Sequence, residues 1–149
     1  MRIPFFGRRE RKHKVLLADD DPAIRETTSF VLEKEGYEVR TAKDGAEALQ
    51  ILDTYEADAV ILDIMMPKLD GFKTLKAIRG HLVRRKVPVI MFTARRTSED
   101  VMKGYAEGAD CYLTKPFRKE QLLESLRQVI SAVEDEREDS ARKRRIVDR

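Results

Sequence analysis

The chain has 149 residues, of which 42% are hydrophobic and 38% charged, as in one globular domain. This composition excludes a collagen, a wholly disordered chain and a membrane-spanning protein, and the single cysteine excludes an intramolecular disulfide and a cysteine-based zinc site. The net charge of +3 is unevenly distributed, because residues 1–14 carry +5 and residues 15–133 carry −2. We therefore expect no basic nucleic-acid-binding face on the globular part and, with no signal peptide, a cytoplasmic protein.

Five short segments predict five strands: three are apolar runs with β-branched residues, the second in chain order alternates apolar and polar residues, and the fifth is short and mixed. They cover residues 15–18, 37–41, 59–62, 87–92 and 109–113. Apolar residues at helical spacing predict five helices, which alternate with these strands. The spacing is seen within residues 24–32, 46–52, 72–78, 101–105 and 122–133. This alternation predicts an α/β fold with a doubly wound parallel sheet, whose functional residues lie at the carboxyl ends of the strands.

Polar residues follow four of the predicted strands at the point where each ends. They are Asp19, Asp20 and Asp21, then Asp63, then Thr93, and finally Lys115. Carboxylates gathered on one edge repel one another, and a divalent cation relieves that repulsion. Oxygen ligands without histidine or cysteine favour Mg²⁺, and the pair Asp19 and Asp20 is typical of metal ligands. Asp21 precedes a proline and is expected to cap a helix instead.

A metal-bound carboxylate beside a lysine and a threonine is suited to phosphoryl transfer. Asp63 stands alone at the end of a central strand and is the expected nucleophile, which would form an acyl phosphate. Mg²⁺ and Lys115 would neutralise the phosphoryl oxygens, and the Thr93 hydroxyl would donate a hydrogen bond to one of them.

These residues resemble the receiver domain of bacterial two-component response regulators, and most closely the single-domain, chemotaxis-type members. The matching segments are VLLADDD at 15–21, ILDIMMPKLDG at 61–71, Thr93-Ala94 and Lys115-Pro116-Phe117. The resemblance covers residues 13–133. It implies a flavodoxin-like five-stranded sheet in the order 2-1-3-4-5 with five helices.

The resemblance also implies roles for individual residues. Asp63 would be phosphorylated by a histidine kinase or a phosphotransfer protein. Mg²⁺ would be bound by the carboxylates of Asp20 and Asp63, by the main-chain carbonyl of Met65 and, largely through water, by Asp19. Thr93 and Tyr112 would form the switch pair, acting on the face made by the fourth helix, the fifth strand and the fifth helix, and Lys115 would contact the phosphate.

Two other functions remain open on the sequence. A Mg²⁺-dependent phosphohydrolase would use the same aspartyl phosphate, but it commonly needs an acid two residues after the nucleophile, where this chain has Met65. A dinucleotide-binding domain would need G-x-G-x-x-G after the first strand, and that motif is absent. A phosphorylation-dependent signalling switch, not a metabolic enzyme, is the preferred hypothesis.

The two ends of the chain are expected to lie outside the receiver. Residues 1–12 form a basic N-terminal tail that is either a simple tail or docks on an acidic partner or a membrane surface. Residues 134–149 are a charged tail or a helix extension, in which Glu138–Arg142 and Asp139–Lys143 are favourable i,i+4 pairs. Because only 16 residues follow residue 133, we expect no direct DNA binding and an output through protein contacts.

The lifetime of the phosphorylated state is expected to depend on the residues two beyond Asp63 and two beyond Thr93. These are Met65 and Arg95. Met65 cannot orient an attacking water, and Arg95 has no acceptor with which to take its proton. We therefore predict slow intrinsic dephosphorylation, over minutes or longer.

Overall fold

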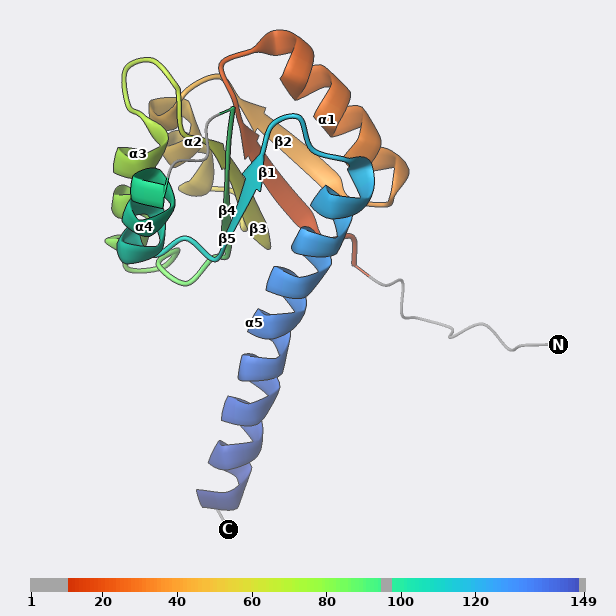
Figure 1. Cartoon of the computed structure of the whole chain (residues 1–149). Helices are drawn as coiled ribbons and strands as arrows, with labels where there is room; N and C mark the ends of the chain where they lie inside the picture. Colours follow the sequence, from red (N-terminus) through yellow and green to blue (C-terminus); the bar gives the residue numbers. More distant parts are fainter. Residues whose placement is uncertain (1–10, 95–97, 148–149) are drawn as a thin grey trace, which may run out of the picture.

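The protein is a parallel sheet with helices on both faces (Figure 1). The structure, a computed structural model, describes residues 11–94 and 98–147. The strands are β1 (Lys14–Ala18), β2 (Glu38–Ala42), β3 (Ala59–Asp63), β4 (Val89–Thr93) and β5 (Cys111–Thr114). The helices are α1 (Pro22–Lys34), α2 (Gly45–Leu52), α3 (Gly71–Arg79), α4 (Ser98–Glu107) and α5 (Lys119–Val147).

All strand pairs are parallel, and the sheet has the order β2-β1-β3-β4-β5, which confirms the predicted flavodoxin-like topology. β3 and β4 are buried along their whole length, and β1 is buried in all but its first residue. This burial explains why their sequences are continuous apolar runs instead of alternating ones.

Each face of the sheet has its own apolar core. On one face, Leu16 and Leu62 pack against α2 and α3 in a cluster that includes Leu75. On the other face, the alternate strand residues pack against α1 and α5, in a cluster that includes Leu32 and Leu126. Because successive side chains of a strand point to opposite faces, one apolar strand supplies both cores.

Aspartates begin three of the helices. Asp21, Asp44 and Asp70 each stand at the N-cap, and each side chain accepts a hydrogen bond from a main-chain N–H in the first turn. The distances are 2.9 Å to Ala23, 2.8 Å to Glu47 and 2.8 Å to Lys73. The prediction that Asp21 caps a helix is confirmed.

α5 is much longer than the receiver core requires. Its apolar residues Leu122, Leu126 and Ile130 are buried against the sheet, whereas residues 134–147 continue the helix and are exposed throughout. In Figure 1 this part of α5 projects away from the sheet and its helices. No helix among the described residues is both long and apolar enough to cross a bilayer.

Candidate functional site

Three carboxylates meet at the carboxyl edge of the sheet. Asp19 and Asp20 directly follow β1, and Asp63 is the last residue of its neighbour β3, so parallel pairing places them side by side. One carboxylate oxygen of each lies within 4.8 Å of the others. Asp19 and Asp63 are buried, and Asp20 is exposed. The edge therefore carries a compact negative cluster with one side open to solvent.

Lys115 lies inside this cluster. It follows β5, and its main-chain N–H donates to the Thr93 carbonyl oxygen at 2.7 Å. Its Nζ is 2.8 Å from Asp19 Oδ2 and 3.4 Å from Asp63 Oδ2. It also lies 4.5 Å from the centre of the Phe92 ring, and the peptide bond to Pro116 is cis. The ammonium group thus bridges the two buried carboxylates.

The electrostatic balance of the site is visible in the pKa of Asp63, which is raised from 3.8 to about 7. Burial is the main cause, and the neighbouring charge of Asp19 adds to it. Lys115 and the Met65 N–H, which donates to Asp63 Oδ1 at 3.1 Å, favour the charged form but do not compensate. One lysine is therefore insufficient to neutralise these carboxylates.

The donor set fits a magnesium ion. The three carboxylates supply hard oxygen atoms, the open side at Asp20 leaves room for water, and the cluster has an excess of negative charge. Asp19, Asp20 and Asp63 are therefore the side chains that could hold the ion.

Main-chain contacts hold the strand ends in place. Asp19 Oδ1 accepts the Asp21 N–H at 2.9 Å, and the Arg25 guanidinium donates to the Asp19 carbonyl oxygen at 2.6 Å. Behind Asp63, the first residue of α3 is Gly71, whose N–H donates to the Ile64 carbonyl oxygen at 3.0 Å. A Cβ atom at Gly71 would lie 2.7 Å from Ile64 Cα, so a side chain there would displace the main chain next to Asp63.

Comparison with known proteins decides the family. A family model described as the response regulator receiver domain matches residues 15–127, which is most of the chain. The chain belongs to this family. It is therefore the receiver domain of a two-component response regulator, and such domains are signalling switches that interact with histidine kinases or phosphotransfer proteins.

Relatives of known name or structure agree with this assignment. The receiver is 38% identical to the DNA-binding dual master transcriptional regulator RpaA of Synechocystis over 117 residues, which are 78% of this chain and 48% of RpaA. It therefore spans about half the length of the curated relatives it matches. The chemotaxis protein CheY4 of Vibrio cholerae has 40% identity and a TM-score of 0.76, covering 80% of this chain and 99% of that chain.

A third relative carries a metal. The receiver domain of the Pseudomonas aeruginosa histidine kinase PA1611 was solved with a magnesium ion coordinated in its active-site cleft. It is 30% identical, with a TM-score of 0.76 over 81% of this chain and 99% of that chain. Its magnesium is consistent with the acidic donor set of this receiver.

Three of the remaining predicted residues, Thr93, Tyr112 and Met65, lie in the described part of the chain. Thr93 is buried at the end of β4, and Tyr112 is buried on the neighbouring β5 with its ring centre 5.5 Å from that of Tyr105. Met65 is 66% exposed in the segment between β3 and α3. Arg95 lies outside the described residues.

The sequence alone indicates no role for Arg25 or Gly71. Both act through the main chain, Arg25 on a carbonyl oxygen and Gly71 by its lack of a side chain, so their residue types alone carry no chemical signal. The position of Gly71 just after a helix-capping aspartate could have drawn attention to it, because a glycine at the first turn of a helix is otherwise unfavourable.

Proposed function

We propose that this receiver accepts a phosphoryl group on Asp63 in a Mg²⁺-dependent reaction, and that this modification changes its contacts with other proteins. The observation that supports the proposal is the position of the Asp63 carboxylate. It is buried, lies 3.4 Å from the Lys115 ammonium, and has two further carboxylates within 4.8 Å.

The reaction joins one Asp63 carboxylate oxygen to phosphorus. As that O–P bond forms, the bond from phosphorus to the donor breaks, and the donor leaves with the electron pair; from a histidine kinase or phosphotransfer protein, the leaving group is the imidazole nitrogen. Mg²⁺, when bound, supplies positive charge that offsets the phosphoryl oxygens and keeps Asp63 ionised. Lys115 adds a second positive charge, and the Thr93 hydroxyl donates to a phosphoryl oxygen.

A hollow beside the site gives the donor protein a surface to approach. It measures about 530 Å³ and lies between the first half of α1 and the segment after β5. Its lining is mainly apolar and includes Ile24, Pro116 and Phe117, together with Lys115. An apolar partner surface seated there would lie next to the reactive carboxylate.

The proposed response passes from Thr93 to Tyr112. Thr93 and Tyr112 lie on adjacent strands, so a turn of the Thr93 side chain toward the phosphoryl group changes the space available to the tyrosine ring. Because Tyr112 contacts Tyr105 of α4, the change alters the face made by α4, β5 and α5, where we place the downstream protein partner. A difference of a few kcal/mol between the two states suffices for such a switch.

The same proposal covers the bounds of the receiver, the location of the protein and the roles of its two ends. Residues 13–133 are the receiver unit, flanked by segments 1–12 and 134–149, and the protein acts in the cytoplasm. The net charge of −2 over residues 15–133 supports an output through protein contacts without DNA binding. Docking of the N-terminal tail on an acidic partner or membrane remains a prediction, because residues 1–10 lie outside the described part of the chain.

Slow loss of the phosphoryl group is also proposed. Met65 is exposed beside the site and has no strong hydrogen-bonding group with which to position a water. Arg95, the other residue expected to flank the water, lies outside the described residues.

The test is phosphorylation by acetyl phosphate, followed by intact mass. With Mg²⁺ the wild type is expected to gain one acid-labile phosphoryl group, and without Mg²⁺ or in the Asp63→Asn variant it gains none. Asp21→Asn is the matched control, because Asp21 neighbours the cluster but caps α1, so this variant should label like the wild type. Labelling of Asp63→Asn at the wild-type rate would refute the assignment of the nucleophile.

A further inference from the structure

α5 continues beyond the body as a charged helix, whose first residue, Glu134, still contacts the body with its Oε1 2.9 Å from His13 Nε2. We call residues 134–147 the α5 extension. All of its residues are exposed. Because α5 begins near the carboxyl edge of the sheet and runs back past the strands, the α5 extension emerges at the edge opposite Asp63 (Figure 1).

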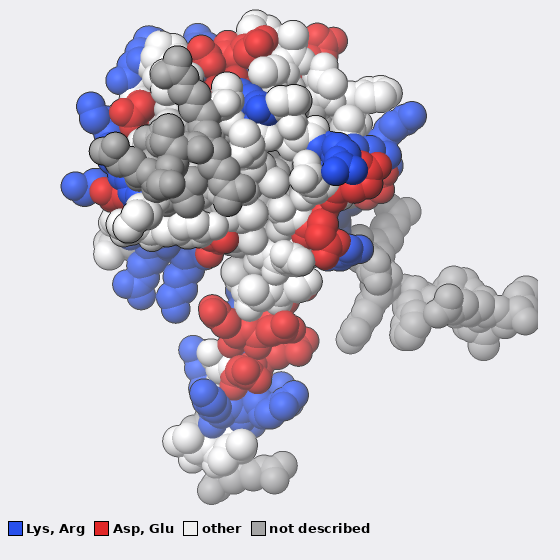
Figure 2. All heavy atoms as spheres, in the orientation of Figure 1, with Lys and Arg blue, Asp and Glu red and all other residues white. Residues whose placement is uncertain are grey.

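Charge is segregated along the α5 extension. Residues 134–139 hold five carboxylates and one arginine, a net charge of −4, and residues 142–145 are all basic, a net charge of +4. Figure 2 shows the acidic and the basic side chains as two successive bands. The two bands are centred at equal distances from residue 140. A second α5 extension that runs in the opposite direction would therefore bring each band against the band of opposite charge.

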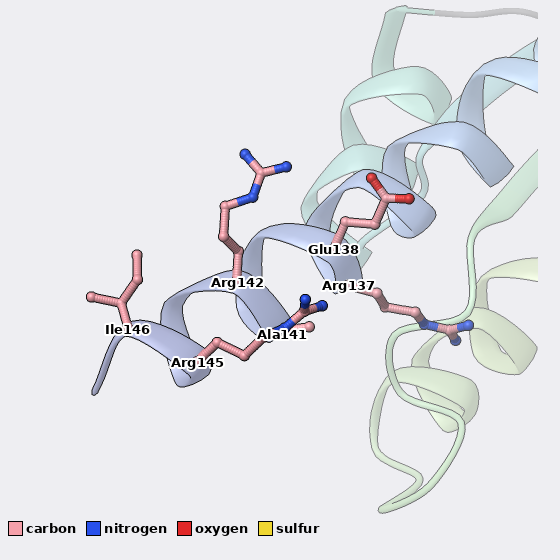
Figure 3. Close-up of a pocket in the computed structure, with 6 residues that line it drawn as sticks. All are labelled: Arg137, Glu138, Ala141, Arg142, Arg145 and Ile146. Atoms are coloured by element: carbon pink, nitrogen blue, oxygen red, sulfur yellow. The ribbon is translucent and has the colours of Figure 1, made fainter. Parts of the chain in front are cut away.

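On one face of the helix, the acidic residues are followed by basic residues. At 3.6 residues per turn, about a third of the circumference holds six residues. They are Glu134, Asp135, Glu138, Ala141, Arg142 and Arg145. Figure 3 shows part of this face, where a hollow of about 590 Å³ is lined by Arg137, Glu138, Ala141, Arg142, Arg145 and Ile146. Ala141 is the short side chain among longer ones, so another helix can approach closely there.

We propose that the α5 extension is a self-association surface, on which a second copy of this chain binds in antiparallel orientation. In the register centred on residue 140, Glu138 lies opposite Arg142 of the second copy, and Asp135 lies opposite Arg145. The two-fold symmetry of such a pair repeats each contact. Parallel pairing would instead place like charges together.

The expected dimer is weak and sensitive to salt. Ion pairs between exposed side chains contribute little individually, and two short helices bury less area than a stable interface requires. Association therefore needs high protein concentration and low ionic strength. It does not need phosphorylation, because the α5 extension lies at the edge of the sheet remote from Asp63.

A single helix also benefits from this charge order. Glu138 and Arg142 are four residues apart and can pair within one chain, and basic residues near the carboxyl end suit the helix dipole. That role alone predicts a monomer under all conditions. Measurement of association therefore separates the two explanations.

The first experiment exchanges charges on the full chain. One variant, Arg142→Glu/Arg145→Glu, makes the face acidic, and another, Asp135→Lys/Glu138→Lys, makes it basic. By sedimentation in low salt, at roughly 0.1–1 mM protein, the wild type should approach twice the monomer mass, each variant alone should remain monomeric, and their equimolar mixture should recover the dimer. About 1 M NaCl should dissociate both dimers. Circular dichroism checks that the variants keep their helix.

A monomeric wild type in low salt would overturn the proposal. So would a mixture that fails to associate while both variants remain helical, or a wild-type dimer that neither substitution affects.

The second experiment tests orientation by disulfide formation, in a Cys111→Ser background. Ala141→Cys, near the centre of the register, should form a disulfide-linked dimer on oxidation. Asp135→Cys should cross-link poorly with itself but readily with Arg145→Cys in a mixture. Cross-linking of Asp135→Cys mainly with itself would show a parallel pair and refute the antiparallel register.

Discussion

The carboxyl edge of the sheet and the α5 extension are built from the same kinds of charged side chain, but burial gives them different energetics. At the sheet edge, Asp19 and Asp63 are buried and Lys115 bridges them at 2.8 and 3.4 Å. On the α5 extension, carboxylates and guanidinium groups are exposed. Charges withdrawn from water interact strongly, and the pKa of Asp63 is raised, whereas exposed charges are screened. A charged residue at the sheet edge therefore indicates a chemical site, whereas a charged residue on the α5 extension indicates a surface for contacts.

Removal of Lys115 should break the buried cluster most severely. Lys115→Ala leaves Asp19 buried without its partner, so in EDTA at pH 8 we expect a loss of about 3–4 kcal/mol in the free energy of unfolding. The loss should shrink at pH 5, where protonation of Asp63 relieves the repulsion. Urea unfolding at both pH values measures it. An equal loss at both would show that packing, not charge, is the cause.

Asp63→Asn should increase the free energy of unfolding, whereas Lys115→Ala decreases it. Because the pKa of Asp63 is raised to about 7, the folded protein holds a proton that the unfolded chain releases near pH 4. The wild type in EDTA therefore loses stability as pH rises from about 4 to 7. The variant does not titrate there, so it should be more stable than the wild type by a few kcal/mol above pH 7 and equal to it near pH 4.

The measurement is urea unfolding of both proteins across this pH range. Asp21→Asn serves as the control, since Asp21 lies outside the cluster and its loss should not produce this pH profile. A constant difference between wild type and Asp63→Asn at all pH values would contradict the raised pKa.

A substitution to alanine in each region should show how tightly that region is packed. Gly71→Ala would place Cβ 2.7 Å from Ile64 Cα, so we expect a loss of about 2 kcal/mol and slower phosphorylation of Asp63. Ser140→Ala on the α5 extension, where the side chain is exposed, should change stability by less than about 0.5 kcal/mol. Thermal unfolding and the phosphorylation rate check both. Unchanged phosphorylation in Gly71→Ala would mean that the site tolerates a shifted main chain.

Neutralising exposed charges should have the smallest effect. Glu138→Gln and Arg142→Gln each remove one member of a solvent-exposed i,i+4 pair, so each should change the monomer's stability by no more than about 0.5 kcal/mol, and less in high salt. Chemical unfolding of dilute protein at two salt concentrations measures this. A loss of unfolding free energy as large as that of Lys115→Ala would contradict the claim that buried and exposed charges differ in their contribution to stability.

The strands and the charged residues at their carboxyl ends could be predicted, because both depend on local sequence. Buried strands require apolar runs, and the chain resumes polar residues where each strand ends, which located Asp19, Asp63 and Lys115. The bridge from Lys115 to Asp19 could not be predicted from spacing, because it spans 96 residues and depends on how β5 is placed in the sheet. For residues 134–147 the sequence left two alternatives, a charged tail or a helix extension, because an exposed helix needs no apolar periodicity; the structure has the helix extension.

The length of α5 has a mechanical consequence. Its 29 residues form a rod of roughly 43 Å, one end of which lies near Lys115 and the other beyond the far side of the sheet. The α5 extension makes up about 21 Å of that rod, so a 5° tilt where it leaves the body would carry its tip roughly 2 Å. A small rearrangement around β5 would thus produce a larger displacement at the distant end of α5, as a lever does.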